Sequence, residues 1–431
     1  MQVIFDQYKG ETAMKNTMKG LGFVTAALLA NLCHQQPAAA GEGMAVDVVH
    51  YWVSKSESGA LDVFRKAWTA SGNQWADLPA KNKVEVQKVV SERITNGYAP
   101  AVMQWNANEG SRELPAMGIV LDIDAVAQAD HWRDVLPATV LDRITYNGHV
   151  YFAPTNIHAE NWLWTSQALF DEAGLKTPTT WDEIFVAAEK IKAKGHVAVA
   201  LGGGPWEVSL IFNNILYAKL GAEGYARIIS GDEIMADDPR MIEALETLRR
   251  LSTYAEPAAA RAPKSWADAT AAVGKGEAGM QFMGDWAKGE LAARGHVVDK
   301  DFGCSLVPGT SIAYFMVIDA FAFPLTNRDA APAAQQAFAR MLLDPVNQVA
   351  FSRIKGSLPV RTDVDPSGLD RCGQLGLKMI SEKKGEVSAQ SMAMPTQMSE
   401  GWINVITEFF NDQAITPQQA QKRMHDVLAE G

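Results

Sequence analysis

Short runs rich in β-branched residues alternate with helical patterns along most of this chain, and that alternation limits its fold more than any other feature. Residues 46–52 form one such run, and residues 60–70 follow it with apolar side chains at helical spacing. Repeated alternation of this kind predicts parallel sheets flanked by helices, an α/β fold. Because binding residues in such sheets gather at the carboxyl ends of strands, Trp52 is expected to face a cleft.

Further helices are predicted at residues 181–194, 334–343 and 417–428. A threonine precedes the first of these as a cap, and Pro417 opens the last, where its fixed φ angle fits the first turn. Two short stretches are interpreted as local breaks, namely residues 202–205 and 258–260. The glycines of the first break lack the lysine and the serine or threonine of a phosphate loop, which argues against nucleotide binding.

Residues 1–40 have the pattern of a secretory signal peptide. Lys15 and Lys19 precede an apolar run at residues 21–30, and the alanines 38–40 supply a cleavage site. No later stretch approaches the length of a membrane span, so we expect an exported protein of the periplasm. The start codon is left open among three methionines: Met1, Met14 and Met18.

The composition of the mature chain limits the kinds of partner that it can bind. Loss of the signal peptide removes three lysines and two acids, so the net charge moves from −11 to −12, which repels nucleic acid and anionic lipid. Only Cys304 and Cys372 remain, and in an oxidising compartment they are either a disulfide or two buried thiols. No spacing of cysteine and histidine fits a zinc motif, so no metal and no cofactor are expected.

Residues 279–290 place an acid beside an indole, after a short β-like run broken by glycine. A pyranose has an apolar face of C–H groups and a rim of hydroxyls, so its site needs an aromatic plate next to fixed charged groups. Asp285 and Trp286 meet that need. The alternative is that Trp286 is a core residue and Asp285 a helix N-cap.

Ten of the twelve tryptophans fall into three groups. Those beside polar or charged groups at strand ends or bends are candidate ligand contacts: Trp52, Trp105, Trp206 and Trp286. Those inside helical patterns are better explained as core: Trp68, Trp132, Trp181 and Trp402. Trp162 and Trp164 alternate on one face of a predicted strand, and either interpretation remains open for them.

Several ordered segments resemble a known family, the periplasmic solute-binding proteins of ABC sugar importers, and within it the glucose/mannose-binding branch. The resemblance runs over essentially the whole mature chain. It is carried by residues 50–54 with Glu57, and by residues 156–164, 203–206, 275–290, 317–321 and 355–363. Residues 395–399 resemble the close of the wider maltose-binding class.

This resemblance implies a two-lobed, maltose-binding-like α/β fold with lobes joined by hinge strands. Lobe 1 would hold residues 41–153 and 316–360, and lobe 2 would hold residues 154–315 and 361–431. The chain would cross between the lobes near residues 153–154, 311–316 and 361–366. Cys304 and Cys372 match paired cysteines of the branch, which implies a disulfide.

The resemblance also assigns a ligand site. Trp52 and Trp286 would stack on the sugar, while Glu57, Asp319 and Lys355 would bind its hydroxyls, because charged hydrogen bonds are about twice as strong as neutral ones. The alternatives are a solvated helix start for Glu57, a surface loop for Lys355, and a costly unpaired acid for Asp319. Further residues are expected near the cleft: Tyr51, Gln104, Asn106, Trp206 and Asp285.

Three departures from the branch bear on the ligand. Tyr51 stands where the branch has a tryptophan, Asn106 where it has a lysine, and residues 391–394 lack a histidine common in relatives. Each buried polar group left unpaired costs about 1–3 kcal/mol, so these changes weaken or redirect hydroxyl recognition. The fold inference is independent of them.

The function implied is capture of a monosaccharide, glucose-like or mannose-like, by hinge closure, and delivery to an inner-membrane ABC permease. A monomer suits this docking, a chemoreceptor is a compatible second partner, and no catalytic residue is required. One alternative is an exported carbohydrate-active enzyme with Glu57 and either Asp319 or Asp285 as its carboxylate pair. The other is a binding protein for an oligosaccharide, a polyol or an amino sugar.

Overall fold

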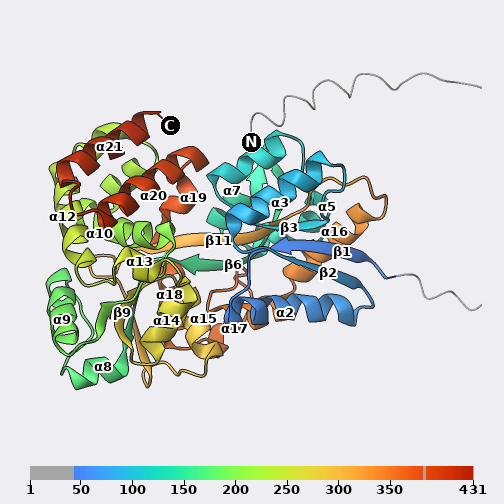
Figure 1. The fold of residues 1–431 in the computed structure, drawn as a ribbon. Helices are drawn as coiled ribbons and strands as arrows, with labels where there is room; N and C mark the ends of the chain where they lie inside the picture. Colours follow the sequence, from blue (N-terminus) through green and yellow to red (C-terminus); the bar gives the residue numbers. More distant parts are fainter. Residues whose placement is uncertain (1–42, 382–384, 431) are drawn as a thin grey trace, which may run out of the picture.

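The computed structural model describes residues 43–381 and 385–430, so the predicted signal peptide lies outside the described residues. Two lobes lie side by side, each built around one β-sheet with helices on its faces (Figure 1). The predicted α/β fold with two hinge-connected lobes is confirmed. The assignment of individual residues to each lobe stays a prediction.

The first sheet has the strand order β12-β11-β3-β1-β2, and β6 pairs with β11. Strands β1, β2 and β3 are parallel, as predicted, whereas β11 runs antiparallel to β3 and β6, so the sheet is mixed. Its strands are β1 (Ala45–His50), β2 (Gln74–Pro79), β3 (Val102–Asn106), β6 (Phe152–Ala159), β11 (Tyr314–Ala322) and β12 (Glu386–Ser388).

The second sheet has the order β10-β7-β9-β8. Its strands are β7 (Trp162–Ser166), β8 (Val197–Val199), β9 (Ala278–Phe282) and β10 (Phe302–Leu306), and a separate pair is formed by β4 (Thr145–Tyr146) and β5 (His149–Val150). Trp162 and Trp164 on β7 are almost fully buried and stack with ring centroids 5.6 Å apart. Both therefore belong to the core of this lobe.

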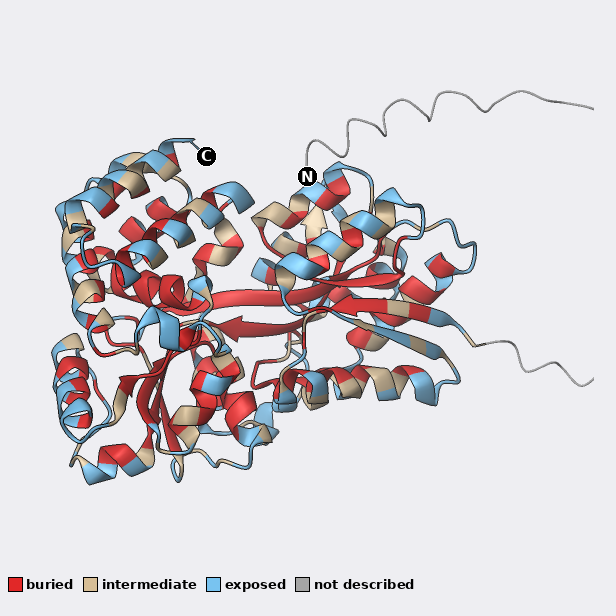
Figure 2. Cartoon of the chain, viewed as in Figure 1, coloured by how far each residue is buried: buried red, intermediate tan, exposed pale blue. Residues whose placement is uncertain are grey.

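Strands β6 and β11 connect the two lobes. They pair antiparallel along their length, and every residue in both is buried, as Figure 2 shows across the centre of the molecule. The predicted crossings near residues 153–154 and 311–316 fall within or at the start of these strands. Any ligand group that contacts this strand pair therefore lies at the junction of the lobes.

The helices follow the sequence patterns closely. The longer ones are α2 (Lys55–Ala70), α3 (Lys83–Thr95), α9 (Trp181–Ala193), α10 (Pro205–Ile229), α12 (Pro239–Ser252), α14 (Trp266–Gly274), α15 (Trp286–Ala293), α16 (Ala331–Leu342), α17 (Pro345–Lys355), α18 (Arg371–Ser381), α20 (Thr396–Asn411) and α21 (Pro417–Glu430). The shorter ones are η2 (Glu109–Arg112), α4 (Glu113–Ala116), α5 (Asp124–Ala129), α6 (Trp132–Val135), α7 (Ala138–Ile144), α8 (Gln167–Glu172), α11 (Glu233–Ala236), α13 (Ala258–Arg261), η3 (Pro366–Gly368) and α19 (Gln390–Ala393).

Two local predictions need correction. The helix predicted at residues 60–70 begins at Lys55, because Ser54 and Glu57 form a capping box that starts the helix earlier. The break predicted at residues 258–260 is the short helix α13, since alanine has the highest helix propensity and Pro257 fixes the preceding turn.

The lobes also meet where α15 packs against α2 and α17. The backbone N–H of Ser56 donates to Oε2 of Glu290 at 3.1 Å, and Glu290 accepts a second bond from Nε of Arg294 at 2.9 Å. Gly289 allows this approach, because a Cβ there would collide with the backbone O of Lys355. The second lobe thus touches the first at α15 as well as through the hinge strands.

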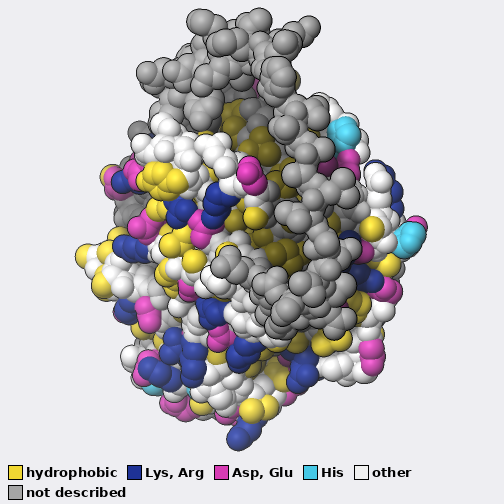
Figure 3. All heavy atoms as spheres, turned by 90° about the vertical axis from the view of Figure 1, so that its right-hand side faces the viewer, with side chains coloured by type: hydrophobic (Ala, Val, Ile, Leu, Met, Phe, Trp, Pro, Cys, Tyr) yellow, Lys and Arg dark blue, Asp and Glu magenta, His cyan; other side chains and the backbone are white. Residues whose placement is uncertain are grey.

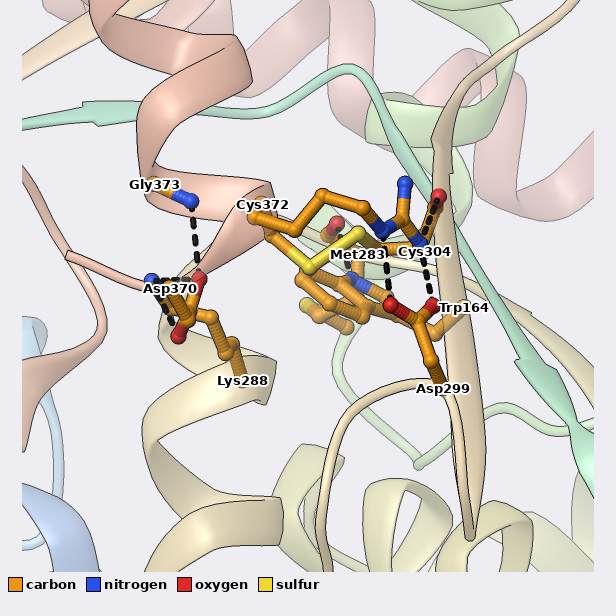
Figure 4. The surroundings of a disulfide bond; sticks show 9 residues. Trp164, Met283, Lys288, Asp299, Cys304, Asp370, Cys372 and Gly373 are labelled. Atoms are coloured by element: carbon orange, nitrogen blue, oxygen red, sulfur yellow. Dashed lines mark hydrogen bonds and ion pairs between the residues drawn. A yellow bond between two sulfur atoms is a disulfide. The ribbon is translucent and has the colours of Figure 1, made fainter.

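A disulfide joins Cys304 of β10 to Cys372 of α18, with a Cα–Cα distance of 6.2 Å (Figure 4). The predicted disulfide is confirmed, and the alternative of two buried thiols is wrong. Arg371 beside it forms an ion pair with Asp299 at 2.6 Å. The bond therefore ties α18 to the second sheet.

Replacing both cysteines with serine should lower the free energy of unfolding by about 4 kcal/mol, since the disulfide closes a loop of 68 residues. Guanidinium unfolding of Cys304→Ser/Cys372→Ser against the oxidised wild type measures this loss. An unchanged midpoint would contradict the stabilising role.

Candidate ligand-binding site

The carboxylate of Asp319 lies at the centre of the site. Asp319 is in β11, opposite Asn106 of β3 and Asn156 of β6. Its Oδ1 accepts from Nδ2 of Asn106 at 2.8 Å, and its Oδ2 accepts from Nδ2 of Asn156 at 3.3 Å. Only 4% of the residue is exposed. The alternative of an unpaired buried acid is therefore wrong, because neighbouring strands supply its partners.

His158 lies between two carboxylates. It is two residues after Asn156 on β6, so both side chains share one face of the strand. Its Nδ1 is hydrogen-bonded to Asp285, and its Nε2 lies 3.3 Å from Oδ2 of Asp319 without the alignment of a hydrogen bond. The imidazole thus bridges the acid of the hinge strand and the acid that precedes α15.

Asp285 occupies the N-cap position of α15 but makes no capping hydrogen bond to it. Its carboxylate instead accepts from the backbone N–H of Ala159 at 3.2 Å and from the hydroxyl of Tyr314 at 3.1 Å. Asp285 is thus the N-cap residue of α15 by position, as the alternative held, but its side chain makes no capping hydrogen bond. The residue fastens the start of α15 to the strand pair β6 and β11.

Electrostatics favour the charged forms of His158 and Asp319. Burial acts to lower the pKa of His158, but the negative charge and hydrogen bond of Asp285 outweigh it and raise the pKa above its usual range. Burial acts to raise the pKa of Asp319, but the nearby imidazole of His158 and the charge of Lys355 hold it below its usual range. The site therefore holds fixed charges of both signs.

Glu57 and Lys355 form a second buried pair. Nζ of Lys355 donates to Oε1 of Glu57 at 3.3 Å. Lys355 is 3% exposed and Glu57 is 8% exposed. Lys355 is the last residue of α17, so the alternative of a surface loop lysine is wrong. Glu57 lies in the first turn of α2, so the alternative interpretation was right about the helix start. It was wrong about solvation, because Glu57 is buried.

Trp52 lies deeper than the sequence suggested. Its ring packs edge-on against Phe321 at 5.6 Å and tilted against Phe351 at 5.3 Å, among the core aromatics of the first lobe. Nζ of Lys355 lies 5.5 Å from the ring centroid and is its link to the charged network. The role of Trp52 as a stacking plate stays a prediction.

Trp286 and Trp206 provide aromatic surface beside the charged groups. Trp286 is half-buried, with its ring 5.2 Å from His158 and 6.1 Å from the ring of Trp206. Trp206 is 37% exposed, so part of this aromatic pair is open to a ligand. An aromatic face next to fixed charges is the arrangement that binding of a pyranose requires.

Tyr51 and Gln104 complete the first lobe's side of the site. The backbone N–H of Tyr51 donates to Oε1 of Gln104 at 2.8 Å, and the phenol hydroxyl donates to Oδ1 of Asn106 at 3.4 Å. Because Asn106 in turn donates to Asp319, the phenol belongs to the same hydrogen-bonded chain. Tyr51 is thus the aromatic residue after β1 that is hydrogen-bonded to the network, whereas Trp52 meets it only through Lys355.

Some buried polar atoms at or beside this site have no hydrogen-bond partner within residues 43–381 and 385–430: Nε2 of His158, Nε2 of Gln104, Oγ of Ser56 and Oγ of Ser357. Buried polar groups are normally hydrogen-bonded, so each such atom is available to a ligand or to water. A ligand with several hydroxyls supplies donors and acceptors in that number.

The structure brings all ten predicted contact residues into connected or adjoining positions. Sequence reasoning missed three residues that hold the network together: Asn156, His158 and Tyr314. The alternation of Asn156 and His158 on a strand opposite Asp319 was a usable signal, because polar side chains on one face of a buried strand need partners. Tyr314 carried no comparable signal.

No group of three or more metal-ligating side chains occurs among the described residues. Within the same part of the chain, no helix combines the length and apolar character needed to cross a membrane. On the face drawn in Figure 3, acidic and basic side chains intermingle, so the net charge there is not gathered in one patch.

Comparison with known proteins places this architecture in a family. Residues 47–349 match the family model described as bacterial extracellular solute-binding protein, and the chain belongs to that family. It is 34% identical over 415 residues to a probable sugar-binding periplasmic protein of Brucella suis biovar 1 (strain 1330), covering 94% of this chain and 97% of that one. A protein of the same description from Rhizobium meliloti (strain 1021) is 34% identical over 377 residues, which cover 85% of this chain and 89% of that one.

Solved structures share the fold at lower identity. A chitin oligosaccharide binding protein superposes with a TM-score of 0.78 at 19% identity, covering 90% of this chain and 99% of that one. The solute receptor AcbH, described with a preference for β-D-galactopyranose, and maltose-bound MalE3 of T. maritima each give 0.74 at 18% identity, covering 90% of this chain and 98% and 100% of theirs. The relatives are binding proteins, and these likenesses establish a maltose-binding-like fold.

The charges of His158 and Asp319 predict a pH dependence of stability. The raised pKa of His158 gives stability that is complete below its ordinary value of 6.5 and is lost as pH rises through the folded-state value. The lowered pKa of Asp319 gives stability that is complete above its ordinary value of 3.8 and is lost as pH falls through the folded-state value.

We therefore expect His158→Gln to lower the free energy of unfolding by about 3 kcal/mol between pH 4 and 6.5, since it removes one partner of a buried pair. The loss should shrink as pH rises through the raised pKa of His158. Urea unfolding of both proteins from pH 4 to pH 9 measures it, and a loss that stays constant up to pH 9 would contradict this account.

Proposed function

We propose that this protein is exported to the periplasm, captures a monosaccharide of the glucose or mannose type between its lobes by hinge closure, and delivers it to an ABC importer. The observation that carries the proposal is the network around Asp319. It joins both hinge strands to the start of α15 and lies beside the partly exposed rings of Trp206 and Trp286.

Two features support a sugar as the ligand. Tryptophan rings offer apolar faces to the C–H groups of a pyranose, and Glu57, Asp319 and Lys355 offer charged partners to its hydroxyls. Relatives described as sugar-binding periplasmic proteins support the same class. A monosaccharide is favoured over a longer sugar because the charged groups form one compact network instead of an extended row.

Closure follows from where these groups lie. A ligand that contacts Asp319 or Lys355 of the first lobe together with Trp286 of the second binds the closed arrangement better than any open one, and it shifts the population accordingly. Moving the equilibrium from mostly open to mostly closed requires about 5 kcal/mol of differential affinity. The closed protein would then dock as a monomer on the membrane permease, and a chemoreceptor is a compatible second partner.

The site is better suited to binding a sugar than to catalysing its hydrolysis. A glycosidase needs a protonated carboxylic acid to deliver a proton to the leaving group. The pKa of Asp319 lies below its usual range, so its carboxylate is not suited to that role. Glu57 is committed to Lys355 and to the capping box of α2. We therefore propose a binding function without covalent chemistry.

Asp319→Asn should weaken sugar binding by about 1.5–3 kcal/mol, because it removes the charge from a hydrogen-bonding acceptor at nearly constant shape. Titration calorimetry, with a sugar found in a melting screen of residues 41–431, measures the change. Asp122→Asn is the matched control, since Asp122 is exposed. Unchanged affinity in a folded Asp319→Asn protein would refute the assignment.

Trp286→Ala should cost at least about 2 kcal/mol of binding free energy, as loss of a central tryptophan commonly does at binding sites. Trp75→Ala is the control, because Trp75 packs against Phe338 on the side of β2, away from the network. Quenching of tryptophan fluorescence by the same sugar gives the affinities. Equal losses in the two variants would show that Trp286 acts through the fold alone.

A further inference from the structure

Glu160 is a half-buried acid that the proposed function does not use. It directly follows β6, and its backbone N–H donates to the O of Phe315 at 3.0 Å, which extends the pairing of β6 with β11 by one residue. The chain bends at Glu160, two residues after His158, and the charge of His158 acts on the Glu160 carboxylate. The acid is therefore a close neighbour of the network.

The partner of this carboxylate is a hydroxyl and not a cation. Oε1 of Glu160 accepts from Oγ of Ser391 in α19 at 3.1 Å. Ser391 is itself fixed, because Nδ2 of Asn108 donates to its backbone O at 3.3 Å. Among the described residues, no lysine, arginine or histidine forms an ion pair with Glu160.

The surroundings of Glu160 leave its charge uncompensated. Burial raises the pKa of Glu160 to about 7, and neither the hydrogen bond from Ser391 nor the charge of His158 offsets the effect of burial. Tyr225 of α10 also interacts with Glu160, and its phenol carries no positive charge in either form. A carboxylate in such a position gains most from a ligand that brings its own cation.

We propose that Glu160 and Ser391 form a seat for an ammonium group, and that the ligand of this protein is an amino sugar. The inference rests on the proposed sugar-binding function. In this arrangement the pyranose ring would lie at Trp286, whose ring is 5.2 Å from that of His158, and its ammonium substituent would lie beyond His158 at Glu160. An ammonium has three N–H donors, which suits one carboxylate and one hydroxyl oxygen together.

Titration calorimetry at pH 7 with matched sugars tests this seat. The probes are glucosamine, galactosamine and mannosamine, with glucose, galactose, mannose and N-acetylglucosamine as uncharged counterparts. We expect the wild type to bind one amino sugar at least about tenfold more tightly than its uncharged counterparts, because a charged hydrogen bond is about twice as strong as a neutral one. Glu160→Gln should abolish that preference while the uncharged sugar binds as before.

Two further variants keep the result interpretable. Glu386→Gln removes another acid near α19, in β12, and should leave the preference intact. Ser391→Ala should reduce the preference without removing it, and it serves in place of Glu160→Gln if that variant does not fold. A preference that survives in folded Glu160→Gln overturns the seat.

The outcomes also separate this inference from the function on which it rests. If an uncharged hexose binds and no amino sugar binds more tightly, the ammonium seat is wrong and sugar capture stands. If no sugar of either kind binds the wild type, the proposed function and the seat both fail.

Discussion

The carboxylate of Asp319 is buried in β11, and removing such a charge from water costs several kcal/mol unless hydrogen bonds and an opposite charge offset it. Here the offset comes from Asn106 on β3 and from Asn156 and His158 on β6. The strands that bring these groups together are therefore tied to one side chain at the junction of the lobes. Because the buried carboxylate of Asp319 needs hydrogen-bond donors and a positive charge around it, it determines which residues can face the ligand.

The same network reaches the second lobe through His158. Asp285, at the start of α15, contacts both His158 and Tyr314, and Glu290 further along α15 accepts the N–H of Ser56 in α2. Of these contacts, the one between Ser56 and Glu290 joins segments predicted to lie in different lobes, so it exists only when the lobes are close together. A ligand that adds hydroxyl contacts to the network therefore favours the closed arrangement, which is the physical basis of capture by hinge closure.

The sequence predicted the parts of this structure that depend on local pattern and pairwise chemistry. Helices α9 and α21 follow from their caps and periodicity, and the pairing of Cys304 with Cys372 followed from the resemblance. The depth of Trp52 could not be predicted, because it depends on Phe321 and Phe351 from distant segments. The bridging position of His158 was likewise missed, since it arises only when β6 pairs with β11, where Asn156 and Asp319 are 163 positions apart in the sequence.

A crystal structure of the protein with the sugar that most raises its melting temperature tests the central claim most directly. The account predicts a ring whose C–H face lies on Trp286, with hydroxyl oxygens within about 3.2 Å of Asp319 and of the Glu57–Lys355 pair. It also predicts that Nε2 of His158 gains a hydrogen bond. A sugar bound elsewhere, with Asp319 contacted by protein groups alone, would contradict the account.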